Sequence, residues 1–243
     1  MPASRSPKRN APRTPPVKLR LAPGDRERQI IDEAIAYFSE VGFSGQTREL
    51  AKRLGVTQPL LYRYFPNKQA LVERVYQTVF EGRWNPAWIP LLQDRKVPLR
   101  ERLVEFYRQY AAATYRPEWI RIYMYAGLSD PTLNRRYIQL VRKHLLPAYC
   151  REVRHACGIP DSDAPVVEEE MEFVWSLHGG IFYMAMREHV YQTKINVDFL
   201  TQVGFAVDNF LAGARTTYPQ LLERFAPEAL GRPRARAVKS RTG

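Results

Sequence analysis

Residues 47–71 read TRELAKRLGVTQPLLYRYFPNKQAL, and this stretch decides the fold of the N-terminal part of the chain. Gly55 divides it into two short segments with apolar residues at helical spacing. We therefore expect one short helix at Thr47–Leu54 and a second at Gln58–Tyr64. Two short helices joined by a tight glycine turn are typical of a helix-turn-helix.

The residues between these helices have turn and cap chemistry. Thr57 is placed to cap the second helix by accepting from a backbone N–H, and Pro59 falls in the first turn, where a missing N–H costs least. Asn67 is a candidate N-cap for a further helix that carries Leu71, and Pro66 disfavours continuing the preceding helix. The cap of the first helix stays open between Gln46 and Thr47.

The second helix leaves polar and aromatic side chains for a partner once Leu61 and Phe65 anchor it. Residues 44–68 carry five basic residues against only Glu49, a local excess of positive charge that suits DNA phosphates. In a helix-turn-helix the second helix enters the major groove of DNA. The segment therefore predicts a DNA-binding surface.

The global charge of +12 is a weaker indication of DNA binding. Six basic residues and no acid lie in residues 1–24, and five more lie in residues 231–243, which leaves 26 basic against 25 acidic residues between them. Residues 1–24 and 227–243 are expected to be disordered basic tails. The first is either a solvated tail or an arm that reaches along DNA.

The stretch IIDEAIAYFSEVGF (30–43), followed by residues 47–71, resembles the DNA-binding domain of the TetR family of bacterial repressors. The resemblance implies that Gln58 and Arg63 reach base edges and that Pro59 and Leu60 touch thymine methyls. It implies phosphate or flanking contacts for the remaining polar candidates. These are Thr47, Arg48, Thr57, Tyr62, Tyr64 and Lys68. Tyr62 could instead be partly buried, and Arg63 could be merely solvated.

The rest of the chain shows helical periodicity without a convincing strand pattern, so the expected fold class is all-α. The expected organisation is a DNA-binding domain at 25–82 and a helical ligand-binding and dimerisation domain at 83–226. Within the second domain we expect one helix over 132–156, kinked at Pro147. Two apolar helices are expected at 165–191 and 197–214.

Residues 173–186 contain no charge, so a helix there must be covered on both sides. The interpretation is a homodimer formed by the helices at 165–191 and 197–214 of two subunits. A single monomeric core is the alternative.

The same domain is rich in aromatic residues that could line a cavity for a bulky, mostly apolar ligand. The aromatic residues that could line it include Tyr137 and Tyr183, and the predicted ligand-site residues are Phe106, Tyr110, Trp119, Tyr123, Trp175, His178 and Phe182. Plain core packing explains any single one of them as well, and His178 could be a satisfied core histidine.

No catalytic, metal-binding or dinucleotide motif is found, so neither an enzyme nor a cofactor is expected. The two cysteines suggest buried thiols in a reducing cytoplasm, and no apolar run reaches the roughly 20 residues of a membrane span. The expected function is a transcriptional regulator, commonly a repressor, that binds double-stranded DNA at a near-palindromic operator and is released by a small-molecule inducer. An architectural DNA-binding protein without a ligand is the alternative.

Overall fold

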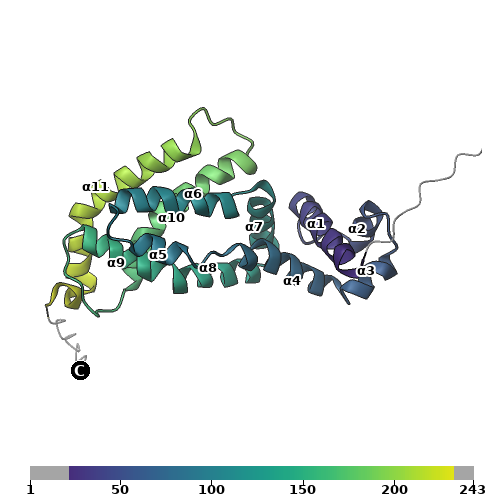
Figure 1. Cartoon of the computed structure of the whole chain (residues 1–243), viewed down its shortest axis with the longest axis horizontal. Coiled ribbons are helices and arrows are strands. Elements are labelled where there is room, and N and C mark those ends of the chain that lie inside the picture. Colours follow the sequence, from purple (N-terminus) through teal and green to yellow (C-terminus); the bar gives the residue numbers. More distant parts are fainter. Residues whose placement is uncertain (1–21, 233–243) are drawn as a thin grey trace, which may run out of the picture.

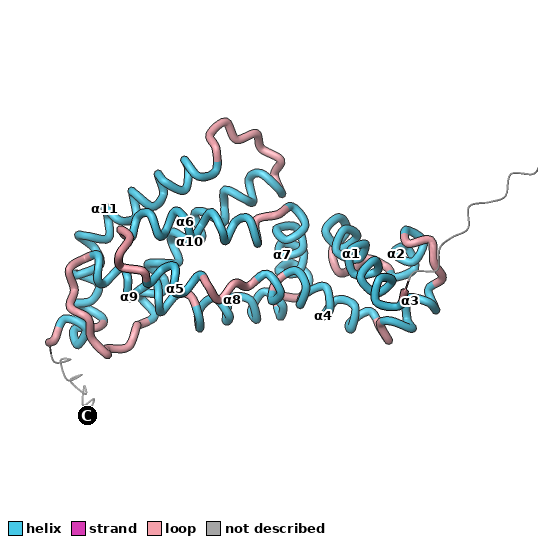
Figure 2. The backbone as a smooth tube through the Cα atoms, in the orientation of Figure 1, coloured by secondary structure: helices cyan, strands magenta, loops and turns pink. Residues whose placement is uncertain are grey.

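The computed structural model describes residues 22–232, and every regular element within that range is helical (Figures 1 and 2). The expected all-α class is confirmed. In chain order the elements are α1 (Pro23–Val41), α2 (Thr47–Arg53), α3 (Gln58–Tyr64), α4 (Lys68–Val79), η1 (Glu81–Arg83), α5 (Trp88–Gln93), α6 (Leu99–Thr114), α7 (Pro117–Ser129), α8 (Thr132–His144), α9 (Leu146–Ala156), α10 (Glu168–His189), α11 (Phe199–Phe225) and η2 (Pro227–Leu230).

Helices α1, α2 and α3 form a small unit at one end of the molecule, and α4 leads from it to the remaining helices (Figure 1). The core of this unit consists of buried apolar side chains from each helix, among them Phe38, Leu50 and Leu61. Gly55 forms the turn between α2 and α3 with φ +63°, a conformation that strains any residue with a Cβ. The expected helix-turn-helix is therefore present.

The two predicted caps have opposite outcomes. Asn67 caps α4 as expected, because its side chain accepts from the Ala70 N–H at 2.8 Å. The predicted side-chain cap by Thr57 is wrong, although Thr57 does precede α3 in extended conformation. Pro59 has no N–H to offer, and the Leu60 N–H donates to the Thr57 carbonyl at 3.0 Å. The Thr57 hydroxyl therefore lacks a donor to accept from.

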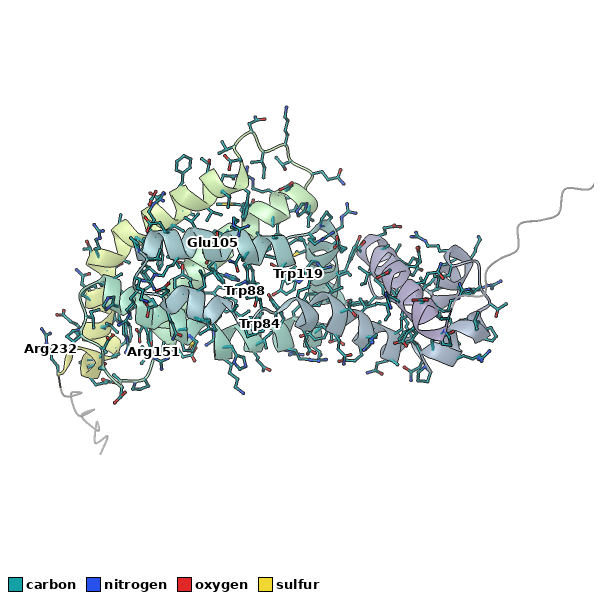
Figure 3. All side chains as sticks on the ribbon, viewed as in Figure 1. Trp84, Trp88, Glu105, Trp119, Arg151 and Arg232 are labelled. Carbon is teal, nitrogen blue, oxygen red and sulfur yellow. The ribbon has the colours of Figure 1, made fainter. Side chains whose placement is uncertain are left out.

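The remaining helices pack into a larger bundle in which α10 contacts α11, α9 and α7, and α11 also packs on α6 (Figure 1). Its core is dominated by aromatic rings. Trp88, Trp119, Phe106 and Tyr107 are each almost completely buried, and Figure 3 shows Trp88 and Trp119 inside the bundle.

Several expected helix boundaries are wrong. The single kinked helix over 132–156 is two helices, because Pro147 lies in the first turn of α9, where it cannot supply a backbone donor to continue α8. The helix expected at 197–214 continues to Phe225, since Tyr218 and Leu222 extend its buried face one and two turns further. The helix expected at 165–191 is shorter, at Glu168–His189.

The ends of the described range also differ from expectation. Helix α1 begins at Pro23, inside the expected tail 1–24, and η2 occupies the start of the expected tail 227–243. Residues 1–21 and 233–243 of the two tails lie outside the described range, and so does the predicted arm on DNA. The domain division after residue 82 stays a prediction, and it falls within η1. Within residues 22–232, no helix has the length and apolar character needed to cross a membrane.

A buried carboxylate ties α9, α10 and α11 together. Glu170 is fully buried on α10 and accepts from the Arg154 guanidinium through both oxygens, at 2.5 and 2.7 Å. The Tyr218 hydroxyl and the Val167 N–H donate to the same carboxylate at 2.8 and 3.1 Å. A buried charge is tolerated only when it is paired and hydrogen-bonded, and Glu170 meets both conditions.

Candidate nucleic-acid interface and neighbouring cavity

Helix α3 presents one face away from the N-terminal core. Pro59, Tyr62 and Arg63 are exposed, whereas Leu61 on the opposite face is 1% exposed. The other members of the predicted DNA-binding set on this helix are half-buried. These are Gln58, Leu60 and Tyr64. The exposed face therefore has an apolar contact, an aromatic hydroxyl and a guanidinium for a partner.

A hydrogen-bonded cluster joins the start of α2 to α3. Thr47 is 6% exposed, and its hydroxyl lies 2.9 Å from the Tyr62 hydroxyl. The Gln58 amide donates to the Thr47 hydroxyl at 3.0 Å and to the Tyr62 hydroxyl at 3.4 Å. The amide donor of Gln58 is thus already used inside the protein, and the contacts of Thr47, Gln58 and Tyr62 with DNA stay predictions. Sequence reasoning missed this cluster, because it depends on how the two helices cross.

The five cations of residues 44–68 divide into two groups. Arg53 points back to α1, where it lies 2.5 Å from Glu40 and stacks over the Tyr37 ring, and its hydrogen bond lowers the pKa of the Glu40 carboxyl. Lys52 lies within a loose 3.9 Å pair with Glu49. The other three have no carboxylate within 4.0 Å in the part of the chain that the structure describes. They are Arg48, Arg63 and Lys68.

A partly open cavity lies in the C-terminal bundle, between α6, α7, α8 and α10. Its volume is about 70 Å³. Six of the seven predicted ligand-site residues line it, and the seventh, Phe106, is buried without reaching it. The six are Tyr110, Trp119, Tyr123, Trp175, His178 and Phe182. That they bind a ligand stays a prediction.

On the α8 side of the cavity, sequence reasoning named only Tyr137 as a possible lining residue and did not include it in the predicted ligand site. Tyr137, Ile138 and Val141 line this side, together with Gly179 of α10. The four-residue spacing of Tyr137 and Val141 is a helical signal that could have placed both on one buried face. It does not indicate that this face borders a void.

The polar atoms around the cavity are uncharged. The Tyr110 and Tyr137 hydroxyls lie 2.5 Å apart, and burial raises the pKa of both phenols. Burial also lowers the pKa of His178 to about 4, so its imidazole is neutral at pH 7. His178 Nδ1 and Trp119 Nε1 have no hydrogen-bond partner among residues 22–232.

Two contacts link the cavity to the helix-turn-helix unit. Phe80, at the end of α4, packs against the cavity residues Trp119 and Tyr137, with ring centroids 4.9 and 5.7 Å apart. Helix α7 carries Trp119 and Tyr123 and also reaches α1, where the Tyr125 hydroxyl donates to the Glu40 carbonyl at 3.0 Å. Trp119 lies on α7, at the end of the bundle next to α1 (Figure 3). A displacement of these rings would therefore be felt by α4 and α1.

Comparison with known proteins gives the class of this chain. Residues 30–75 match the model of the bacterial regulatory proteins of the TetR family. The chain is 45% identical over 51 residues to the tetracycline repressor protein class A from transposon 1721 of Escherichia coli, which covers 21% of this chain and 24% of that repressor. It is 43% identical over 61 residues to the nucleoid occlusion factor SlmA of Haemophilus ducreyi, covering 23% of this chain and 30% of that protein.

Solved structures extend the likeness of the fold beyond this segment. A TetR-like transcriptional regulator from Rhodococcus sp. RHA1 has a TM-score of 0.58 at 19% identity, covering 80% of this chain and all of that one. A TetR-family regulator from Streptomyces coelicolor has a TM-score of 0.55 at 17% identity, covering 87% of this chain and 90% of that one. Residues 30–75 therefore match the TetR family of bacterial regulatory proteins, and the fold of the described chain is similar to that of solved TetR-family regulators. Its sequence match spans only about a quarter of the tetracycline repressor named above.

Proposed function

We propose that this chain is a sequence-specific DNA-binding regulator of transcription whose α3 reads the major groove. The observation that carries the proposal is the exposed Arg63 on α3, flanked by Arg48 and Lys68, none of which has a carboxylate partner among the described residues. A guanidinium pairs with both acceptors of guanine, and the flanking cations suit phosphates. Arg53, by contrast, stabilises the fold of the unit.

Dimerisation is the second part of the proposal, with α10 and α11 as the interface. Both helices have an exposed surface with glycine in mid-helix, at Gly180 and Gly213, and a Cβ built at either position meets nothing within 4 Å. Exposed aromatic rings lie on the same two helices, Tyr183 at 52% and Phe205 at 62% exposure. Small residues beside exposed aromatics are suited to the close approach of a second copy of the chain.

A bulky side chain in this surface tests the dimer. We expect Gly180→Leu to weaken self-association by at least about tenfold, because the added side chain would occupy the space of the second subunit. Ala112→Leu, at an exposed position on α6, is the control and should leave self-association unchanged. Sedimentation equilibrium measures both, and equal association of the two variants would refute an interface at α10.

The third part of the proposal is release of the DNA by a small molecule in the cavity, which makes the protein a repressor. The cavity rings Trp119 and Tyr137 contact Phe80 at the end of α4, the helix that carries the helix-turn-helix. A ligand that displaces these rings favours a different setting of α4 and hence a different spacing of the two recognition helices. Release follows because the ligand binds the two settings with unequal affinity.

The experiment that tests the function is selection of DNA fragments from a random pool by the full-length protein, followed by sequencing. The expected result is a near-palindromic sequence whose half-site centres lie about one helical turn, roughly 34 Å, apart. If the selected DNA has no preferred sequence and its binding depends steeply on salt, the protein is instead an architectural DNA-binding protein.

A further inference from the structure

The residues that line the cavity between α6, α7, α8 and α10 define the chemistry of a ligand that would fit it. This inference rests on the proposed function only in taking the cavity as the effector site. Ten residues line the cavity, and none of them is Asp, Glu, Lys or Arg. A charged ligand would lose its hydration without gaining a counter-charge, which is strongly unfavourable. The ligand class is therefore uncharged.

The walls favour an aromatic ring. Trp119 and Tyr123 stack with an interplanar angle of 12°, and Phe182 meets Tyr123 edge to face at 72°. Tyr137 meets Trp119 edge to face as well, at 74°. A planar ring can continue either arrangement, since aromatic pairs prefer offset stacking or edge-to-face contact.

The size of the cavity sets an upper limit on the ligand. The volume of about 70 Å³ is roughly half of the 150 Å³ apolar cavity that holds benzene in an engineered protein. A single ring enters only if a wall side chain yields. Trp175 and Phe182 are half-buried and can yield, as are Tyr123 and Ile138, whereas Trp119 and Tyr137 are buried.

His178 offers a hydrogen-bond partner to one polar group of the ligand. His178 is 8% exposed, lines the cavity, and its Nδ1 has no hydrogen-bond partner within residues 22–232. Buried polar atoms are nearly always paired in folded proteins, so a cavity-lining imidazole whose buried nitrogen is unpaired lacks one hydrogen-bond partner. A neutral imidazole has one donor and one acceptor, and a hydroxyl group can pair with either.

We propose that the cavity binds an uncharged, single-ring aromatic molecule with a hydroxyl group, a phenol, whose ring packs on Trp119 and Tyr123 and whose hydroxyl pairs with His178. The hydroxyl provides the partner that the imidazole lacks. Gly179, adjacent to His178 in sequence, borders the same space and leaves room for the ring.

The test is titration of the full-length protein with phenol. Calorimetry and the change in the fluorescence of Trp119 and Trp175 measure the binding. Toluene, which has nearly the same shape without the hydroxyl, and benzoate, which is charged, are the comparison ligands. Phenol is expected to bind and benzoate is not. In His178→Phe the ratio of phenol affinity to toluene affinity should fall about tenfold, because one hydrogen bond is lost and the volume change affects both ligands alike.

Two variants at Gly179 keep the test independent of His178. Gly179→Leu should abolish binding of phenol and of toluene by filling the cavity. Gly179→Ala should retain both, since its Cβ would meet only Trp175, at 3.9 Å. The melting temperature of each variant shows that it is folded.

Three results would overturn the inference: no phenol binding up to its solubility limit, equal binding of benzoate, or an unchanged phenol-to-toluene ratio in His178→Phe. Selective DNA binding by a protein that ignores phenol leaves the proposed regulator standing while this ligand class fails. Phenol that binds as expected but leaves DNA affinity unchanged supports the ligand class and refutes release through this cavity.

Discussion

Arg63→Ala is expected to lower the affinity for the selected DNA by about 1–3 kcal/mol in each half-site and to relax the base preference at one position of that half-site. The reason is geometric. Arg63 is exposed on α3 without a carboxylate partner in the described chain, so its guanidinium is available for the two acceptors of a guanine. Fluorescence anisotropy with the selected site and with single-base variants of it measures both effects.

Arg53→Ala is the matched control, because Arg53 carries the same charge in the same segment. Its guanidinium is 2.5 Å from Glu40 and over the Tyr37 ring, on the side of α1. We expect only a small loss of DNA affinity and an unchanged base preference. If the two variants weaken binding equally and neither alters base preference, Arg63 acts as a simple positive charge and the proposed reading of the groove is wrong. Lys68→Ala should reduce the salt dependence of DNA affinity by about one released ion without changing the base preference.

Glu170→Ala is expected to destabilise the fold by about 3–5 kcal/mol, because it breaks a buried ion pair by removing one partner. Removal of the carboxylate leaves the Arg154 guanidinium buried at 4% exposure without a counter-charge, and the Tyr218 hydroxyl loses the nearer of its two acceptors, at 2.8 Å. Chemical denaturation measures the change in the free energy of unfolding. The base preference should be unaffected, because these side chains join α9, α10 and α11 and do not contact α3.

Glu169→Ala provides the control one residue away, since Glu169 is exposed on the same turn of α10. Its effect should lie within about 0.5 kcal/mol. Glu170→Gln separates shape from charge, because the amide fills the same volume but cannot neutralise Arg154. A Glu170→Ala protein as stable as the Glu169→Ala protein would show that water or a shift of Arg154 compensates for the lost carboxylate.

Features that depend on a few neighbouring residues were predictable from the sequence. The Asn67 cap and the Gly55 turn follow from local backbone chemistry, and both are present. The Thr57 cap follows from the same rule and is wrong, because Pro59 two positions later removes one of the donors that such a cap needs. The rule for an N-cap threonine considers Thr57 alone and does not include the donor that Pro59 lacks.

Features that depend on packing were not predictable in the same way. Pro147 ends one helix and starts another, whereas Pro219 lies inside α11 without breaking it. Burial is not what separates the two, because Leu146 and Tyr149 beside Pro147 are as fully buried as Tyr218 and Leu222 beside Pro219. The sequence shows a proline at both positions and does not show which of them ends a helix.

The candidate site divides along the same line. The aromatic composition of the C-terminal part indicated which residues could form a cavity, but only the packing of α8 against α7 shows that Tyr137 borders it and Phe106 does not. The positive charge of residues 44–68 was visible, but the pairing of Arg53 with Glu40 requires α1 and α2 to meet. The composition of the sequence indicates which residue types can form the cavity and the basic surface. Which side chains meet depends on how the helices pack against one another.

The internal bonds of Gln58 have a kinetic consequence for the search along DNA. In the proposed binding mode, the Gln58 amide keeps its partners Thr47 and Tyr62 away from the target, so the protein slides over phosphates with no base-reading group left unsatisfied. At a matching adenine, the proposed mode has the amide exchange these bonds for two bonds to the base. That exchange is a conformational step after landing, and we expect it to lengthen the residence time on the correct site while leaving the association rate nearly the same for all sequences.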